Sequence, residues 1–340
     1  MEQVSPARIS RSAILGKTWE ISKQQGALIV LILLFIAASL RYQYFLTAYN
    51  MNSFLSYNAI FVLLAIGETF VIMTGSGGID ISLGSVAALS AVVAARMSNH
   101  GLWLALLVVL GVGLAVGVIN GLAITWLRVP PFIATLAMLL GARGMALVVS
   151  GNATVSANAN NDFPSIFWGN WLGISIPIWL LIAALVIGTL VLYMTRFGRH
   201  ILAIGGNEEA TRLMGLPVAR IKFLVYVISG VLASLAGMLL AAQVYAGNPN
   251  EGVGWELSAI AAVVVGGTLL TGGKGTIFGS VVGALLLGLI FNVLNFENGY
   301  GLISLSSYWE TVMRGAFLFI VVILQNRLAA RKRLQQTQRP

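Results

Sequence analysis

The sequence predicts an all-α, polytopic membrane protein with about ten transmembrane helices. Of its 340 residues, 58% are hydrophobic and only 9% are charged, whereas a soluble domain carries about 25% charged residues. Apolar stretches close to the ~20 residues needed to cross a bilayer recur along most of the chain. The net charge of +9 therefore reflects membrane topology and does not indicate nucleic-acid binding.

The apolar stretches divide the chain into three parts. Residues 1–25 form a cytoplasmic N-terminal segment, residues 26–326 form the transmembrane domain, and residues 327–340 form a cytoplasmic tail. The expected spans lie near 26–46, 57–74, 83–97, 102–126, 131–149, 173–195, 221–245, 256–271, 276–296 and 309–326. The first span is expected to be uncleaved, because its polar leader is long for a signal peptide and many spans follow.

The basic residues give an independent prediction of orientation. With the N-terminus inside, all but four of the 20 lysines and arginines fall in cytoplasmic segments. The exceptions are Arg41 and Arg96 outside and Arg143 and Arg314 within spans. The loops 150–172, 246–255 and 297–308 contain no lysine or arginine. This positive-inside pattern places both termini in the cytoplasm. It makes 150–172 an external loop, which we expect to form an ordered cap or a re-entrant segment.

Several kinds of chemistry find no support in the sequence. There are no cysteines and two histidines, so disulfides and thiolate chemistry are excluded and no metal site is predicted. A P-loop requires Ser or Thr after Gly-Lys, but Gly275 follows Gly273-Lys274. No constellation of catalytic residues is visible, so we predict no catalytic residue and no cofactor in this chain.

The cytoplasmic loop 196–222 is the longest polar interruption between the spans, and it contains a short capped helix by sequence. Asn207 is a good N-cap, and Glu208 and Glu209 occupy the first turn, where the helix dipole favours negative charge. Gly215 is a natural stop before Pro217. The pattern predicts a compact helix presented on the cytoplasmic side, available to a partner.

An internal similarity predicts two structural repeats. Residues 77–86 (GGIDISLGSV) align with residues 272–281 (GGKGTIFGSV) at a constant offset of 195, and half of the ten positions are identical. Each stretch lies between two spans in the same predicted orientation, which favours parallel repeats; the alternative is a chance likeness of glycine-rich turns. The structural glycine breaks assigned to these stretches are Gly77, Gly78, Gly84, Gly272, Gly273 and Gly279.

Other glycines recur at every fourth position. Gly113, Gly117 and Gly121 follow this spacing, as do Gly279 and Gly283. Because glycine lacks a Cβ, it lets helices approach closely in lipid. Close helix packing is therefore the expected role of these glycines.

Polar side chains within spans are candidates for a solute path, because they are costly in hydrocarbon. The polar candidates are Glu68, Asp80, Asn120, Arg143, Asn292 and Asn295, and Phe132 is added to them as a further path residue. A structural pair or hydrogen bonds to backbone are the alternative for Glu68 and Arg143, and capping of the helix that begins near Ser82 is favoured for Asp80. The asparagines can instead bond to one another between helices.

Four ordered motifs carry a family resemblance. They are GGIDISLGS, PPFIATLAML, IGGNEEATRLMG, and AIAAVVVGGTLLTGGKGTIFGSVVGALLLG followed by SSYW. From about residue 45 to 325, the chain resembles the ribose-type sugar permeases of bacterial ABC importers, in the superfamily of monosaccharide and branched-chain amino acid permeases. The sequence departs from the family pattern at Gly75-Ser76, at Glu68, and in the longer segment 295–300.

The resemblance implies a permease subunit in the bacterial inner membrane that translocates a monosaccharide. Its partners would be ABC ATPase subunits that bind ATP and Mg²⁺, a second identical or similar permease chain, and a periplasmic or lipid-anchored sugar-binding protein. The loop 196–222 would dock on the ATPase, since Glu209-Ala210-Thr211 to Gly215 fits the family's coupling pattern with Thr in place of the second Ala. The implied coupling residues are Gly205, Gly206, Asn207, Glu208, Glu209, Ala210, Thr211, Arg212 and Gly215.

One alternative function remains open from the residues themselves. The internal repeat and Glu68 are compatible with an ion-coupled secondary transporter of a small polar solute. The sequence lacks the chain of acids and histidines that relays protons, although a sodium site built from carbonyls and hydroxyls would leave no such pattern. Accumulation by the purified chain alone, without an ATPase, would decide for this alternative.

Overall fold

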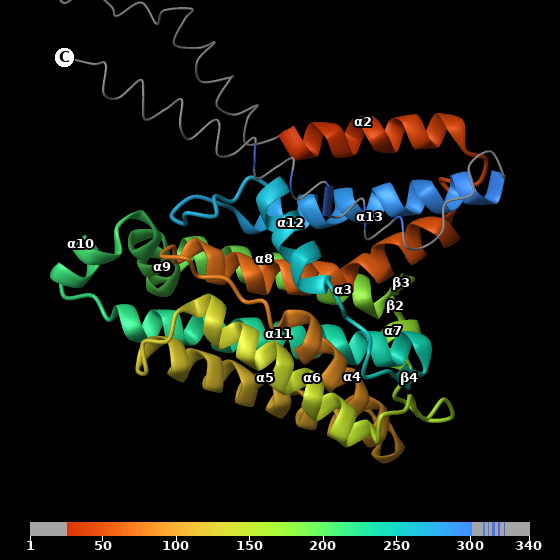
Figure 1. The fold of residues 1–340 in the computed structure, drawn as a ribbon. Coiled ribbons are helices and arrows are strands. Elements are labelled where there is room, and N and C mark those ends of the chain that lie inside the picture. Colours follow the sequence, from red (N-terminus) through yellow and green to blue (C-terminus); the bar gives the residue numbers. More distant parts are fainter. Residues whose placement is uncertain are drawn as a thin grey trace, which may run out of the picture.

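The computed structural model describes residues 26–300 and six single residues between 309 and 323. The expected segment 1–25, most of the tenth span with Arg314, and the tail 327–340 lie outside the described residues. The described chain is mostly helical (Figure 1). Its α-helices are α2 (Gly26–Arg41), α3 (Ala48–Met73), α4 (Leu83–Met97), α5 (Leu102–Thr125), α6 (Pro131–Ser150), α7 (Ser165–Trp168), α8 (Ile176–Met194), α9 (Arg196–Gly206), α10 (Glu208–Leu213), α11 (Val218–Val244), α12 (Trp255–Val265) and α13 (Ile277–Tyr300).

The strands are confined to the loops at one end of the bundle. They are β1 (Val155–Ser156), β2 (Asn170–Trp171), β3 (Ile174–Ser175) and β4 (Ala246–Gly247). Strand β1 pairs antiparallel with β4, and β2 pairs antiparallel with β3. The segment 150–172 is thereby anchored to the chain after α11, and Trp168 Nε1 adds a hydrogen bond to the Ala242 carbonyl. These loops and the α9–α10 segment lie at opposite ends of the long helices (Figure 1).

Six described helices are long and apolar enough to cross a membrane: α3, α5, α6, α8, α11 and α13. This supports the predicted all-α membrane protein. Helices α2 and α12 are apolar but shorter, with 16 and 11 residues. The predicted span 256–271 is therefore wrong in its extent, because an 11-residue helix rises only about 16 Å. The glycine-rich chain after Val265 leaves the helical path and has positive φ at Gly267 and Gly272.

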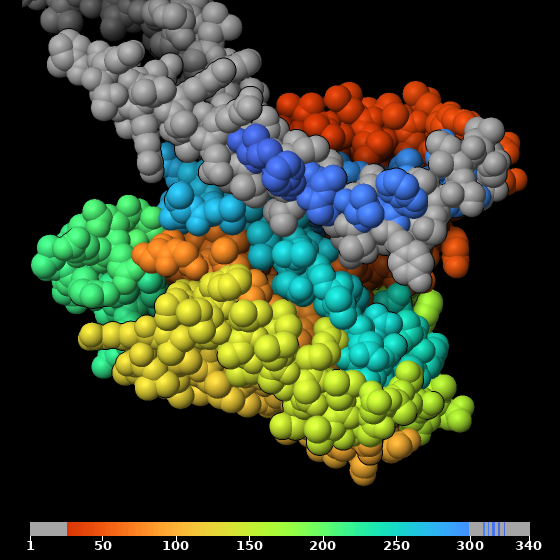
Figure 2. Space-filling model, viewed as in Figure 1, coloured from red at the N-terminus to blue at the C-terminus, as the bar shows by residue number. Residues whose placement is uncertain are grey.

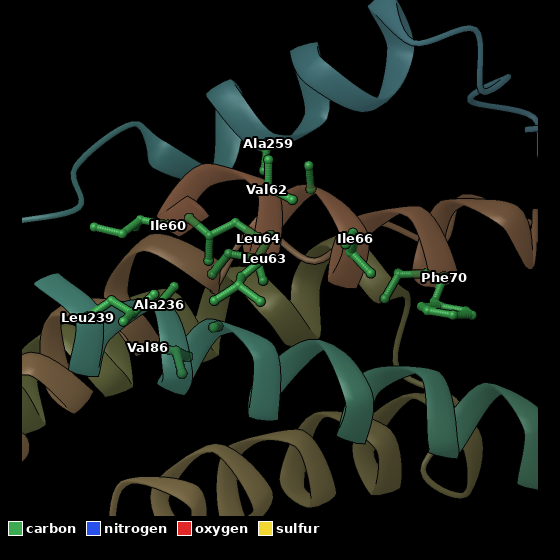
Figure 3. Close-up of a cluster of buried hydrophobic side chains, with 14 of the residues drawn as sticks. Ile60, Val62, Leu63, Leu64, Ile66, Phe70, Val86, Ala236, Leu239 and Ala259 are labelled. Atoms are coloured by element: carbon green, nitrogen blue, oxygen red, sulfur yellow. The ribbon is translucent and has the colours of Figure 1, made fainter. Parts of the chain in front are cut away.

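Helix α3 forms the centre of the bundle. It is apolar on nearly all faces, as expected for a helix surrounded by other helices. In its most apolar 18-residue stretch, 83% of the residues are buried. Its contacts come from helices far along the chain, as Figure 3 shows. Ile60, Leu63, Leu64 and Ile66 of α3 lie in one cluster with Val86 of α4, Ala236 and Leu239 of α11, and Ala259 of α12.

The regularly spaced glycines pack helices together, as predicted. On α5, a Cβ at Gly113 would overlap Ser234 and Gly230, and one at Gly121 would lie 2.7 Å from the Phe223 ring. On α13, a Cβ at Gly283 would overlap the Ala262 carbonyl of α12. Larger residues at these positions would force the helices apart.

Candidate functional site

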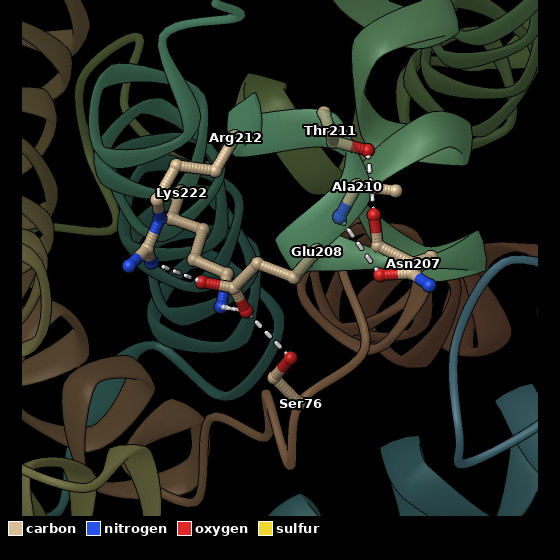
Figure 4. A network of polar contacts seen from close by, with 7 residues as sticks. All are labelled: Ser76, Asn207, Glu208, Ala210, Thr211, Arg212 and Lys222. Atoms are coloured by element: carbon tan, nitrogen blue, oxygen red, sulfur yellow. Dashed lines mark hydrogen bonds and ion pairs between the residues drawn. The ribbon is translucent and has the colours of Figure 1, made fainter. Parts of the chain in front are cut away.

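The cytoplasmic loop expected from the sequence consists of two helices, of which only α10 was predicted. Asn207 caps α10 as expected, since its Oδ1 accepts a hydrogen bond from Ala210 N at 2.9 Å (Figure 4). Gly215 follows the helix with a φ of +78°. The preceding α9 is amphipathic, with Ile201 and Ile204 buried. These two helices form the protrusion at the left of Figure 2.

Helix α10 presents a mixed polar and apolar surface to solvent. Glu209, Ala210 and Arg212 are exposed, whereas Thr211 is buried. Leu213 and Met214 are 83% and 68% exposed. These two were not among the predicted coupling residues, although large apolar residues within a short polar helix are a signal of a binding surface.

Glu208 points into the protein, in contrast to its neighbour Glu209. Its carboxylate accepts hydrogen bonds from Ser76 Oγ and Lys222 Nζ, both at 2.5 Å, and pairs with Arg212 at 2.9 Å (Figure 4). Burial is the largest influence on the pKa of Glu208 and raises it, but the hydrogen bonds and charges of these partners together lower that pKa below its ordinary value. Glu208 therefore joins α10 to the turn after α3 and to the first turns of α11.

Both predicted glycine turns meet α9 at this end of the bundle. Gly273 N donates a hydrogen bond to the Met73 carbonyl at 3.1 Å. A Cβ on Gly205 of α9 would overlap the same carbonyl and Gly273, and a Cβ on Gly75 would lie 3.2 Å from Gly205 Cα. The backbones of the two turns and of α9 are thus in direct contact, with no side chain between them.

The six predicted break glycines divide into two groups. Gly77, Gly272 and Gly273 adopt positive φ, and Gly78 lies in the same non-helical turn as Gly77. Gly84 and Gly279 do not break helices; they lie in the first turns of α4 and α13. The backbones of Gly252 and Gly266, respectively, occupy the space that their Cβ atoms would fill.

Three candidate path residues lie together in a buried polar network. Glu68 accepts the backbone N–H of Asp80 at 3.2 Å, and Asp80 accepts hydrogen bonds from Ser82 and from Ser229 Oγ. Asn120 Nδ2 donates to Ser82 Oγ at 3.1 Å. Glu68, Asp80 and Asn120 are at most 2% exposed. The network ties α3, α5 and α11 to the chain before α4.

Arg143 and Phe132 of α6 lie away from this network. Arg143 donates hydrogen bonds to the carbonyls of Pro249 and Glu251 in the loop after β4. Both Glu68 and Arg143 thus bond to backbone, which was one of the expected alternatives. Phe132 is 57% exposed on the outside of the bundle.

The remaining two candidates, Asn292 and Asn295, line a cavity of about 190 Å³ between α3, α12 and α13. Its other polar lining residues are Asn58 and Ser258, and its walls include Phe54, Tyr57, Phe61 and Phe291. Asn292 Nδ2 donates to Asn50 Oδ1 at 3.0 Å. Among the residues that the structure describes, none of the lining side chains is charged, so amides, hydroxyls and aromatic rings define the chemistry of this lining.

A bundle with six described helices long and apolar enough to cross a membrane, interrupted by glycine turns, has the architecture of a multi-pass membrane protein. Residues 50–322 match the family described as "Branched-chain amino acid transport system / permease component". The chain belongs to this family. Its members move solutes as transporter components, and the chain is accordingly a permease and not an enzyme.

Individual relatives cover nearly the whole chain. The ribose import permease of Escherichia coli (strain K12) is 37% identical over 316 residues, which is 92% of this chain and 95% of the relative. The corresponding protein of Bacillus subtilis (strain 168) is 39% identical over 313 residues, 91% and 95% of the two chains. The L-arabinose ABC transporter permease of Azospirillum brasilense is 34% identical over 322 residues, 94% and 91%. The predicted resemblance to ribose-type sugar permeases is confirmed. No solved structure matches the chain significantly.

Proposed function

We propose that this chain is the transmembrane permease subunit of an ABC importer that moves a monosaccharide across the bacterial inner membrane. Relatives named as ribose and L-arabinose permeases support the sugar as solute class. ATP and Mg²⁺ bind to the separate ATPase subunits. A second permease chain, identical or similar, completes the channel, and a periplasmic or lipid-anchored binding protein delivers the sugar.

The contact of α9 and α10 with both glycine turns is the observation that carries this proposal. A force applied by an ATPase to α10 reaches the first turn through Ser76–Glu208 and both turns through Gly205. This contact is made by backbone atoms, with no side chain between them that could rotate away. A displacement of α9 must therefore move the end of α3 and the chain before α13. The exposed Glu209, Leu213 and Met214 form the docking surface for the ATPase.

In this proposal the full domain has ten membrane helices in two parallel repeats, with both termini in the cytoplasm; one of the ten, α12, is too short to cross the bilayer by itself. The two glycine turns support the repeats, since each follows a buried helix and precedes an apolar one, and both lie at the α10 end. Basic residues at this end support the orientation. Arg128, Arg212, Arg220 and Lys222 line one groove there.

The solute path in this proposal runs past the cavity lined by Asn58, Ser258, Asn292 and Asn295. Amide and hydroxyl groups can exchange hydrogen bonds with sugar hydroxyls, and aromatic walls give apolar surface for the faces of the ring. The cavity is smaller than the ~300–1,000 Å³ of drug-sized ligand sites. Glu68, Asp80 and Asn120 hold the helices around the path and do not contact the solute.

Proteoliposomes containing the permease, its ATPase and its binding protein test the proposal. Glu209→Lys and the double variant Leu213→Ser/Met214→Ser should fold normally, lose ATP-driven sugar uptake and retain less ATPase on purification. Val253→Ser is the matched control, because Val253 is 74% exposed in the loop after β4. Full uptake in both α10 variants would refute the docking role. Sugar accumulation driven by an ion gradient in the permease alone would replace the ABC assignment with secondary transport.

A further inference from the structure

A broad basic groove of about 910 Å³ lies beside α10, where α5 ends and α11 begins. Arg128, Arg212, Arg220 and Lys222 line it, and Glu208 is the single acidic residue among the described residues of the lining. Glu208 is already paired with Arg212 and Lys222. In the part of the chain that the structure describes, Arg128 and Arg220 are exposed and form no ion pair. The groove therefore has an excess of positive charge available to an anion.

The groove adjoins apolar surface of two membrane-crossing helices. Trp126 lines it, is 53% exposed, and packs edge-on against Phe223 with ring centroids 5.2 Å apart. Leu127 is 74% exposed, and Leu122 and Leu224 are each 43% exposed. Exposed tryptophan is typical of the level of lipid headgroups, with apolar side chains below it facing acyl chains.

We propose that this groove binds the phosphate headgroup of an anionic phospholipid, whose acyl chains lie along α5 and α11. Arginine is well suited to phosphate oxygens, because its planar fork donates two parallel hydrogen bonds. Basic pockets between membrane helices are a known form of lipid recognition. Arg128 and Arg220 would contact the phosphate, and Leu122, Leu127 and Leu224 would contact the chains.

The apolar surface beside the groove, formed by Leu122, Leu127 and Leu224, favours a lipid over an acidic segment of a partner protein. An acidic protein segment would use the arginines but would leave Leu122 and Leu224, which belong to membrane-crossing helices, without a role. A phospholipid satisfies both parts of the surface at once. Lipid binding can be measured on the purified permease without the ATPase, so its test does not depend on transport.

Titration of the full-length permease with phosphatidylglycerol, followed by native mass spectrometry, tests this site. Each basic residue near an anionic lipid surface contributes about fivefold in affinity. Arg128→Gln/Arg220→Gln should therefore weaken phosphatidylglycerol retention about 25-fold, while phosphatidylcholine retention stays unchanged. Arg199→Gln is the matched control, because Arg199 is an exposed arginine of α9 that does not line the groove.

Three outcomes would overturn the proposal. The first is equal phosphatidylglycerol retention by the double variant and the wild type. The second is displacement of bound lipid by inorganic phosphate at the same concentration, which would assign the groove to a free anion. The third is loss of ATPase co-purification in the double variant with lipid retention intact, which would assign the groove to the ATPase. Thermal unfolding of the double variant in phosphatidylcholine discs, followed by tryptophan fluorescence, separates loss of binding from loss of folding.

Discussion

Ser76 Oγ donates a hydrogen bond to Glu208 Oε2 across 132 positions of the sequence. The bond joins the turn after α3 to the first residue of the exposed helix α10 (Figure 4). Lys222 Nζ donates to the same oxygen. A single carboxylate thus connects the turn after α3, helix α10 and helix α11, and it gives the coupling proposal its most direct structural test.

Glu208→Gln should lower the stability of the purified permease by about 0.5–1.5 kcal/mol. The variant keeps the size of the side chain but removes the charge that holds Lys222 and Arg212. Tryptophan fluorescence during thermal unfolding measures the change. Glu209→Gln is the matched control and should have no effect on stability, because Glu209 is exposed and makes no ion pair in the described residues. Equal unfolding temperatures for the two variants would contradict this role of Glu208.

The stabilising effect of Glu208 should depend on pH with a defined sign. Its folded-state pKa lies below the ordinary value of 4.5, so the folded protein binds the proton less readily than the unfolded chain. The contribution is therefore complete above pH 4.5 and is lost as the pH falls through the lower folded-state pKa. The unfolding temperatures of wild type and Glu208→Gln should differ at neutral pH and converge in acid. A difference that grows as the pH falls would refute this assignment.

Gly205→Ala should destabilise the protein by about 1–3 kcal/mol and reduce uptake. The added methyl group would overlap the Met73 carbonyl and Gly273, and these backbone atoms cannot rotate away as a side chain can. Gly206→Ala is the matched control for stability, because a Cβ there meets no atom within 4 Å. Thermal unfolding and uptake measure both effects. Wild-type behaviour of Gly205→Ala would show that the two glycine turns and α9 are not held in contact.

Ser229→Ala should cost about 1–3 kcal/mol, because buried Asp80 loses a hydrogen-bond donor. The Ser229 Oγ–Asp80 Oδ2 distance is 2.7 Å. Ser234→Ala on the same helix provides the comparison, since Ser234 Oγ donates its hydrogen bond to Val231 O within α11. Loss of that bond removes no connection between two helices. Chemical unfolding in detergent compares the two variants. A larger loss for Ser234→Ala would argue against the network as a connection between helices.

Asn295→Leu should reduce sugar uptake about tenfold, the effect of losing one or two hydrogen bonds of ~1 kcal/mol each. The substitution removes an amide from the cavity lining while leaving most of the apolar walls in place. Uptake of radiolabelled sugar into proteoliposomes measures the effect. Asn250→Leu, in the loop after β4, is the control. Unchanged uptake in Asn295→Leu would exclude this side chain from the path.

Features that depend on neighbouring residues were predictable from the sequence. The Asn207 cap, the stop at Gly215 and the left-handed turn at Gly272–Gly273 need only a few consecutive residues. Residue type alone was not sufficient for Gly84 and Gly279. They follow the other glycines of their motifs but lie inside helices, because their function is to admit a neighbouring backbone.

The roles of polar residues within spans depended on which helices are neighbours. The sequence marked Glu68, Asp80 and Asn120 as unusual, but it could not show that they share one buried network. It also grouped them with Asn292 and Asn295, which line a separate cavity. In the sequence, a polar residue on an apolar helix looks the same whether it belongs to a buried hydrogen-bond network or lines a cavity.

The sequence by itself determined that this chain is an all-α membrane protein with a capped helix in its longest polar loop, and four motifs carried its resemblance to sugar permeases. Hydropathy, charge and capping act over one helix or one turn, so they can be read without the fold. Only the tertiary structure decided that Gly75, Gly205 and Gly273 meet, and that Glu208 is held inside while Glu209 faces solvent. Those relationships arise from the packing of segments far apart in the chain, where the absence of a Cβ or the reach of one carboxylate determines which backbones can touch.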